Sequence, residues 1–191
     1  MHGGPGSGMS PRLLRQFDAR VWSVFGLDQR GCGRSLPAGE CRHNTTQDLI
    51  DDIERLRQLL GIDRWLVCGG SWGATLALAY VAQQPQRVSA LLLRNVFLAS
   101  RQEATALFAA PGAAAPFVQH EAWCALQDVW DGYAAQSGSA SSAANEPAAR
   151  LALSHALLQH GAGDWPQQLA LAWARWEAAL EGAAWRAPAT P

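Results

Sequence analysis

The sequence predicts an α/β fold, in which a small parallel sheet with covering helices is followed by a helical region. Three observations support this prediction. Short apolar runs alternate with helical patterns through residues 1–100, and strands separated by helices in this way form parallel sheets with right-handed connections. A Gly-rich turn joins one apolar run directly to a helix. No run typical of a buried strand follows Ser100, so we expect a core domain over residues 1–100 and a helical region over residues 101–191.

The first predicted elements are a short helix and a strand. The dipeptide Ser10-Pro11 is typical of an N-cap followed by a first helical position, and it predicts a helix over residues 11–17. Residues 21–27, VWSVFGL, form an apolar run rich in β-formers and bounded by polar residues. Such a run is typical of a buried parallel strand.

A strong helix is predicted next. It begins after Thr45 or Thr46, its apolar residues recur at helical spacing, and Gly61 stands where a C-terminal cap belongs. A second strand over residues 65–68 and a third over residues 90–98 follow.

Between these two strands, a helix is predicted from about Ala74 to Gln84, where Pro85 stops it. In the region after Ser100, residues 101–109, 117–136 and 148–181 are expected to be helical. The segment QSGSASSAANEP between the last two is expected to be a flexible loop.

Composition excludes several classes of function. The net charge of −1 gives no field to hold nucleic acid or an anionic membrane, so neither is expected as a partner. No signal peptide is recognisable, and no stretch reaches the ~20 apolar residues that a membrane helix requires. The four cysteines lack metal-ligand spacing, so we expect reduced thiols and no metal or other cofactor. The sequence therefore predicts a cytoplasmic protein.

Gly69-Gly70-Ser71-Trp72-Gly73 matches the G-x-S-x-G pattern between an apolar strand and a helix. The glycines permit a sharp turn that places the serine hydroxyl at a helix N-terminus, where backbone N–H groups favour negative charge. Ser71 is therefore a candidate nucleophile, and the Trp72 amide is a candidate oxyanion-hole donor. The alternative is an ordinary tight turn with a capping serine.

A second motif opens the chain. His2-Gly3-Gly4-Pro5-Gly6 belongs to the HGG-type loops that supply another oxyanion-hole amide, for which the Gly4 N–H is the candidate. By itself, such an opening could be an unstructured tail. The two motifs in this order, one strand-helix-strand unit apart, favour a serine hydrolase.

Several segments resemble the proline iminopeptidases, which are α/β-hydrolases. They are HGGPGSG, DQRGCGRS, NTTQDLIDDIERLR and WLVCGGSWGATLALAY. The resemblance extends from His2 to about Leu107 and resumes at Leu169–Glu177, which is similar to the Trp-x-x-Trp-Glu stretch of that family's cap domain. It implies a partial α/β-hydrolase fold followed by a helical cap region.

The resemblance also implies a function and site residues. It implies a serine peptidase that releases N-terminal proline from peptides through an ester on Ser71, so the expected partner is a peptide with an N-terminal proline. Glu177 matches an acidic cap residue that binds the substrate amine, and Phe97 matches an aromatic wall of the proline pocket. Glu177 could instead be a solvated helix residue, and Phe97 could be plain core.

Two further residue sets are interpreted without a catalytic role. Phe108 falls near a position where the family often has Tyr, so a hydroxyl would be missing there. In the loop DQRGCGRS, we expect Asp28 to form a buried structural network with Arg30 or Arg34.

The acid and histidine of a catalytic triad are not evident. In this fold they follow the serine in chain order, each after a further strand, whereas His120, His155 and His160 lie in helical or Gly-rich segments. No central strand precedes the His2 loop either, so the chain is expected to be truncated at both ends and inactive alone. A non-catalytic remnant and a hydrolase of another ester or amide remain open alternatives.

Overall fold

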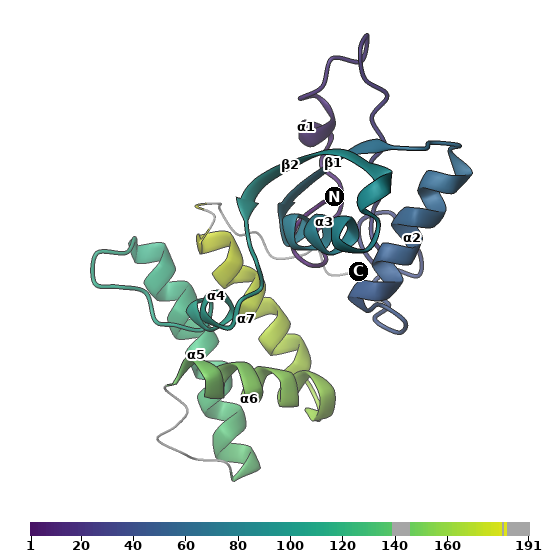
Figure 1. Ribbon diagram of the computed structural model, residues 1–191. Helices are drawn as coiled ribbons and strands as arrows, with labels where there is room; N and C mark the ends of the chain where they lie inside the picture. The colour runs from purple at the N-terminus through teal and green to yellow at the C-terminus, as the bar shows by residue number, and fades with distance from the viewer. Residues whose placement is uncertain (139–145, 181, 183–191) are drawn as a thin grey trace. The chain divides into compact units, whose positions relative to one another are not determined.

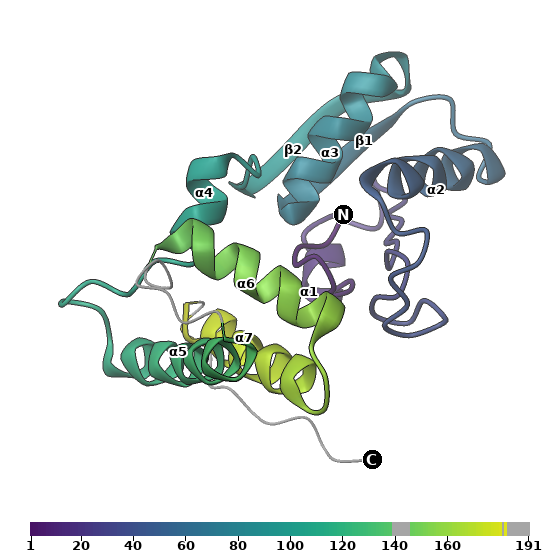
Figure 2. The same ribbon diagram turned by 90° about the horizontal axis from the view of Figure 1, so that it is seen from below.

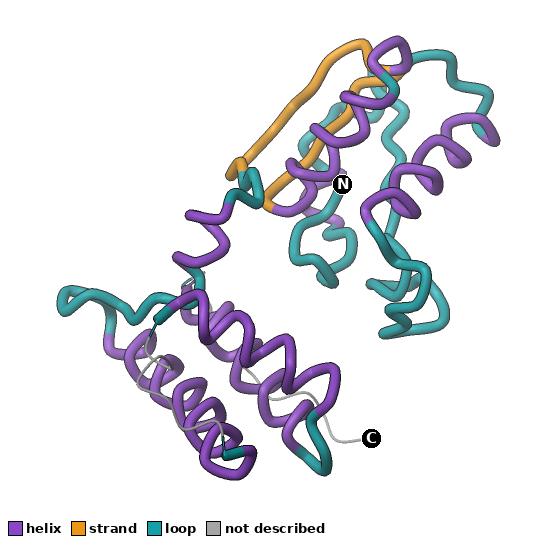
Figure 3. The backbone as a smooth tube through the Cα atoms, turned by 60° about the horizontal axis from the view of Figure 1, so that its bottom comes forward, coloured by secondary structure: helices purple, strands orange, loops and turns teal. Residues whose placement is uncertain are grey.

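The computed structural model describes residues 1–138, 146–180 and 182. The chain divides into two compact units, Met1–Ser100 and Arg101–Pro191. The first unit holds a small sheet with helices, and the described part of the second unit is helical (Figures 1 and 3).

The sheet has two parallel strands joined by a helical crossover. Strand β1 (Trp65–Ser71) pairs with β2 (Val88–Val96), and α3 (Trp72–Gln83) and the 3₁₀ turn η1 (Pro85–Arg87) connect them. The register begins at Trp65 opposite Val88 and ends with Ser71 opposite Val96. A parallel sheet with a helical crossover is the predicted α/β class, which is confirmed.

Helix α2 (Thr46–Leu59) begins and ends close to the predicted positions. Thr45 is the N-cap, and its hydroxyl accepts from the Asp48 N–H while the Asp48 carboxylate accepts from the Thr45 N–H. This reciprocal capping box satisfies two backbone donors that the helix itself leaves free. Gly61 follows the last turn with a φ of 65°, a conformation that glycine adopts readily.

The core of the first unit lies between α2, α3 and the sheet (Figure 1). Its buried residues come from all three, and apolar burial of this kind supplies most of the stability of a small domain. They are Leu49, Ile50, Ile53, Val67, Leu76, Ala77, Tyr80 and Val88.

Two predictions for residues 11–27 are wrong. Helix α1 (Pro11–Leu14) ends three residues before Phe17. The predicted strand over residues 21–27 does not form, and the described sheet has two strands where three were expected. A strand exists only through hydrogen bonds to a neighbouring strand, and residues 21–27 have none beside them among the described residues. Val21 and Phe25 accordingly remain 72% and 49% exposed.

A largely apolar cavity of about 390 Å³ is lined by residues of this segment and of the sheet. Its lining includes Val24, Phe25 and Leu27 as well as Leu66 and Val67 of β1. The apolar side chains of residues 21–27 therefore contribute to a cavity, and their backbone does not pair with β1.

The second unit contains four described helices: α4 (Arg101–Ala106), α5 (Phe117–Ser137), α6 (Pro147–His160) and α7 (Trp165–Leu180) (Figure 2). Helices α5, α6 and α7 pack against one another.

The single helix predicted over residues 148–181 is two helices. Gly161 and Gly163 separate them, and Gly163 has a φ of 64° that a continuous helix does not accept. The predicted helix over residues 101–109 also ends early, at Ala106. Most of the expected flexible loop, residues 139–145, lies outside the described residues.

Aromatic side chains build the core of this helical unit. Trp123, Trp130 and Trp176 are at most 5% exposed, and Trp123 meets both of the others edge to face. The buried Arg150 guanidinium stacks over Trp123 and Trp130, with its carbon 4.7 Å and 5.5 Å from the ring centroids. Its Nη1 donates to the Phe108 carbonyl.

In the described part of the chain, no helix combines the length and apolar character needed to cross a bilayer.

Candidate active site

Ser71 occupies a strained turn between strand and helix. It is the last residue of β1, its φ and ψ are 55° and −125°, and α3 starts at the next residue. A non-glycine residue in such a sparsely populated region costs on the order of 1–3 kcal/mol, and these outliers cluster at functional sites. The Ser71 side chain makes no capping hydrogen bond to α3, and the residue is exposed. The alternative of a simple capping serine therefore does not describe this turn.

Two glycines of the motif are required by close packing. A Cβ on Gly69 would lie 2.1 Å from the Gly73 carbonyl oxygen, and a Cβ on Gly73 would lie 2.4 Å from the Met1 oxygen and 2.7 Å from the His2 oxygen. The start of α3 thus packs directly on the first two residues of the chain. Gly70 has room for a side chain, because the atom nearest to a Cβ there would be the Arg94 oxygen at 3.8 Å.

The glycine-rich opening loop lies beside Ser71. A Cβ on Gly3 would be 3.2 Å from the Ser71 Cβ and 3.7 Å from its Oγ. Gly4, with a φ of 109°, turns so tightly that a Cβ there would lie 2.5 Å from the Gly6 nitrogen. The residues His2–Gly8 therefore form an ordered loop against the turn. Backbone N–H groups from this loop and from the start of α3 are the kind of donors that stabilise an oxyanion.

Gln29 joins the two motifs, and its role was not predicted from the sequence. It is 4% exposed; its side-chain Nε2 donates to the His2 oxygen at 3.1 Å, and its Oε1 accepts from the Trp72 indole N–H at 3.2 Å. Its backbone N–H also donates to Nε2 of the buried His2 ring at 3.0 Å. The only sequence signal was its place in the DQRGCGRS motif.

Asp28 holds two loops together. Its Oδ1 accepts from the Met9 N–H at 2.5 Å, and its Oδ2 accepts from the Arg34 backbone and side chain at 3.2 and 3.1 Å. The Met9 N–H, followed by those of Arg34, lowers the pKa of Asp28 despite the burial of the carboxylate. The expected Asp28–Arg34 pair is present, but the Arg34 side chain is 86% exposed, so the pair is not a buried network.

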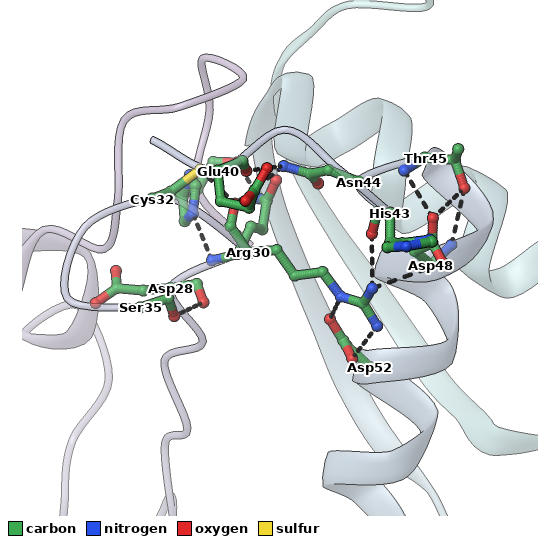
Figure 4. Close-up of polar contacts among 12 residues, drawn as sticks. Asp28, Arg30, Cys32, Ser35, Glu40, His43, Asn44, Thr45, Asp48 and Asp52 are labelled. Carbon is green, nitrogen blue, oxygen red and sulfur yellow. Dashed lines mark hydrogen bonds and ion pairs between the residues drawn. The ribbon is translucent and has the colours of Figure 1, made fainter. Parts of the chain in front are cut away.

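Arg30 belongs to a separate network (Figure 4). Its Nε and Nη2 donate to the two carboxylate oxygens of Asp52 on α2 at 2.5 and 2.9 Å, and its Nη1 donates to the His43 carbonyl at 2.6 Å. The bidentate geometry suits a guanidinium. Arg30 therefore ties the loop to α2, and it does not pair with Asp28.

Phe97 follows the end of β2. Val96, the preceding residue, pairs with Ser71, and the Phe97 carbonyl accepts a hydrogen bond from the Thr75 hydroxyl of α3. Phe97 is only partly buried. It thus lies at the same sheet edge as the nucleophile candidate, since parallel strands end together.

Glu177 and Phe108 belong to the second unit. Glu177 is exposed on α7. Phe108 is buried in the helical core, and its ring centroid lies 4.9 Å from that of Trp173. The substrate-binding role of Glu177 remains a prediction.

The histidines after Ser71 lie on helices of the second unit: His120 on α5, and His155 and His160 on α6. Among the described residues, no hydrogen bond joins Ser71 to a histidine. The described segments also contain no cluster of three or more His, Cys, Asp or Glu that could hold a metal ion.

A strand-turn-helix with a strained serine at the turn and a glycine-rich loop beside it is the arrangement found in α/β hydrolases. The profile of the α/β hydrolase fold family matches residues 1–142, and the chain belongs to this family.

Within that class, the chain is similar to proteins named proline iminopeptidase. It is 41% identical to the one from Neisseria gonorrhoeae over 180 residues, covering 94% of this chain and 54% of the relative. It is 46% identical to the Arabidopsis thaliana protein over 129 residues, covering 68% of this chain and 33% of the relative. A probable proline iminopeptidase from Leptolyngbya boryana is 52% identical over 103 residues, covering 54% and 32%. The chain thus spans about half the length of the Neisseria relative and about one third of the other two.

Proposed function

We propose that this chain carries the nucleophile part of a serine hydrolase that releases N-terminal proline from peptides. The observation that carries the proposal is the backbone of Ser71, held at a φ of 55° with its side chain beside Gly3. Strain of this kind is maintained only where the surroundings enforce it. The similarity to proline iminopeptidases supports the choice of substrate.

In the proposed reaction, the Ser71 hydroxyl attacks the carbonyl carbon of the N-terminal proline. The Gly4 and Trp72 N–H groups stabilise the oxyanion, and the peptide bond to the second residue breaks. A histidine base takes the serine proton and gives it to the leaving amine, and water then hydrolyses the ester. Neither that histidine nor its acid is identified among the described residues.

Substrate recognition is assigned to two residues. The N-terminal proline is a secondary ammonium on an apolar ring, which favours a carboxylate beside the nitrogen and an apolar wall beside the ring. We propose Glu177 for the first role and Phe97 for the second. The position of Phe97 directly after the partner of Ser71 supports its assignment.

The second candidate is a non-catalytic remnant of such an enzyme. It is favoured by one observation. The described histidines after Ser71 all lie on α5 and α6, whereas the triad histidine of this fold follows a further strand. A serine without its base retains only catalysis from the oxyanion hole and binding, which is orders of magnitude weaker. We therefore expect little turnover from the 191 residues alone.

A chimera tests the assignment of Ser71 as the nucleophile. Residues of the Neisseria gonorrhoeae proline iminopeptidase that align with this chain are replaced by this chain, so that the relative supplies the remaining sequence. The chimera is expected to hydrolyse proline p-nitroanilide, and Ser71→Ala is expected to lower kcat by about 10⁴-fold or more. Circular dichroism confirms folding of each variant. A folded chimera that keeps its activity after Ser71→Ala would refute the assignment of the nucleophile.

The same proposal includes a cytoplasmic location, a peptide as the partner, and no requirement for a cofactor, nucleic acid or membrane. The near-zero net charge supports the proposal that neither nucleic acid nor a membrane is required.

A further inference from the structure

Gln29 makes two hydrogen bonds to His2 of the opening loop and one to Trp72 beside Ser71, and its carbonyl accepts a fourth from the Cys32 N–H. The side-chain amide donates to the His2 oxygen and accepts from the Trp72 indole N–H. These partners define the amide orientation, because a carbonyl oxygen only accepts and an indole N–H only donates. At 4% exposure, Gln29 has little access to water that could replace either partner.

The third bond orients the His2 ring. The Gln29 backbone N–H donates to His2 Nε2, so the single hydrogen of the neutral imidazole lies on Nδ1. Nδ1 lies 2.9 Å from the Gly3 oxygen, to which its hydrogen points. The Gly8 N–H also points at Nδ1 from 3.2 Å, but a nitrogen that carries the hydrogen cannot accept from it, so the two contacts exclude each other and the Gln29 hydrogen bond to Nε2 selects the first. His2 is 1% exposed, so this arrangement is shielded from solvent.

The Gly3 oxygen in turn determines where the next amide points. In a planar trans peptide, the N–H lies on the opposite side from the preceding C=O. Holding the Gly3 oxygen toward the His2 ring therefore directs the Gly4 N–H away from that ring. The hydrogen bond from the Gln29 side chain to the His2 oxygen constrains the plane of the preceding peptide, between His2 and Gly3, in the same way.

We infer that Gln29 is a positioning residue, which sets the Gly4 amide of the opening loop relative to Ser71. Its side chain connects the loop to Trp72, and its backbone acts through His2. The inference rests on the proposed function only in assigning the Gly4 N–H to the oxyanion. The connection itself involves no turnover.

Hydrogen exchange of the full 191-residue chain tests this inference. Gln29→Met keeps the side-chain length and removes both side-chain hydrogen bonds. The backbone amides of residues 3–9, apart from Pro5, which has no N–H, are expected to exchange about tenfold faster or more, as loss of a buried hydrogen-bond partner implies. Amides of α2 and α5 are expected to keep their wild-type rates. Because exchange needs no activity, the result stands whether or not the chain is an enzyme.

Gln83→Met is the matched control. Gln83 also makes two side-chain hydrogen bonds, both with Gln47, but it is exposed at the far end of α3. This variant is expected to leave residues 3–9 unchanged. Unchanged exchange of the loop in Gln29→Met, or an equal acceleration in the loop and in α2, would overturn the inference.

Gln29→Glu provides a second variant if Gln29→Met does not fold. It retains an acceptor for the Trp72 indole but places an oxygen against the His2 oxygen. The Trp72 indole resonance, assigned by its loss in Trp72→Phe, is expected to stay at its wild-type position while residues 3–9 exchange faster. Wild-type exchange of the loop in Gln29→Glu would also contradict the inference.

Discussion

The backbone conformation of Ser71 shows that the surrounding structure holds this residue in a strained turn. Its positive φ costs energy that an ordinary turn would avoid, and its hydroxyl is not used to cap α3. The G-x-S-x-G pattern predicted this turn because the pattern is local. Gln29 could not be predicted in the same way, since its partners are 27 and 43 residues away in the chain and depend on the tertiary fold.

Glu54 is a residue whose charge stabilises the first unit. Hydrogen bonds from Arg57 and then from Tyr80 outweigh its partial burial and lower its pKa to about 2. The Arg57 guanidinium also donates to the Ile62 and Asp63 carbonyls just beyond α2. Glu54 and Arg57 therefore secure the end of this helix.

Glu54→Gln is expected to lower the free energy of unfolding by about 2 kcal/mol at pH 7, because it leaves Arg57 buried without its carboxylate. A depressed pKa stabilises the folded state above the unfolded value near 4.5, and this contribution is lost as the pH falls toward 2. Urea titrations at pH 7 and pH 3 should thus show a smaller pH dependence in the variant. Glu40→Gln is the control, since its partner Arg42 is exposed, and it should change stability by about 0.5 kcal/mol or less.

At the scale of elements, the site depends on α3 meeting the opening loop. The start of this helix has no room for a side chain at Gly73, because the Met1 and His2 oxygens occupy that space. The first residues of the chain and a helix seventy residues later are therefore parts of one structure. The motif glycines predicted a tight turn, but the contact with Met1 and His2 required the fold.

Gly73→Ala is expected to displace the loop and to lower the free energy of unfolding by about 1–3 kcal/mol, as overpacking does. Exchange of residues 3–9 should accelerate in parallel. Gly70→Ala, two residues before Trp72, is the control, because its Cβ would have 3.8 Å of clearance. Equal effects of the two substitutions would show that the packing at Gly73 is not specific.

The wrong predictions also belong to this scale. Residues 21–27 have the composition of a strand, but composition does not provide a neighbouring strand, and among the described residues the sheet contains only β1 and β2. Residues 148–181 have helical periodicity on both sides of residues 161–166, where Gly161, Gly163 and Pro166 signalled the break that the structure shows.

At the scale of the molecule, each unit has its own core. The first is built mainly from aliphatic residues around α3, and the second from tryptophans of α5 and α7 in edge-to-face contact. Separate cores imply that local destabilisation in one unit need not spread to the other.

Trp130→Ala tests this independence. Trp130 is 1% exposed, and its removal is expected to cost about 3–5 kcal/mol within the helical unit. Hydrogen exchange should accelerate in α5, α6 and α7 and stay unchanged in α2 and β1. Leu76→Ala, at a fully buried site of α3, should have the reciprocal effect. Acceleration across both units in either variant would contradict independent cores.

The most direct measurement is fluorophosphonate labelling of the folded chimera with the Neisseria gonorrhoeae relative, with the modified residue located by mass spectrometry. The probe reacts with a serine hydroxyl that is activated and faces oxyanion donors. Labelling that approaches one equivalent on Ser71, and that disappears in Ser71→Ala, is the predicted result. A folded chimera that stays unlabelled, or that carries the label on a different serine, would contradict the account.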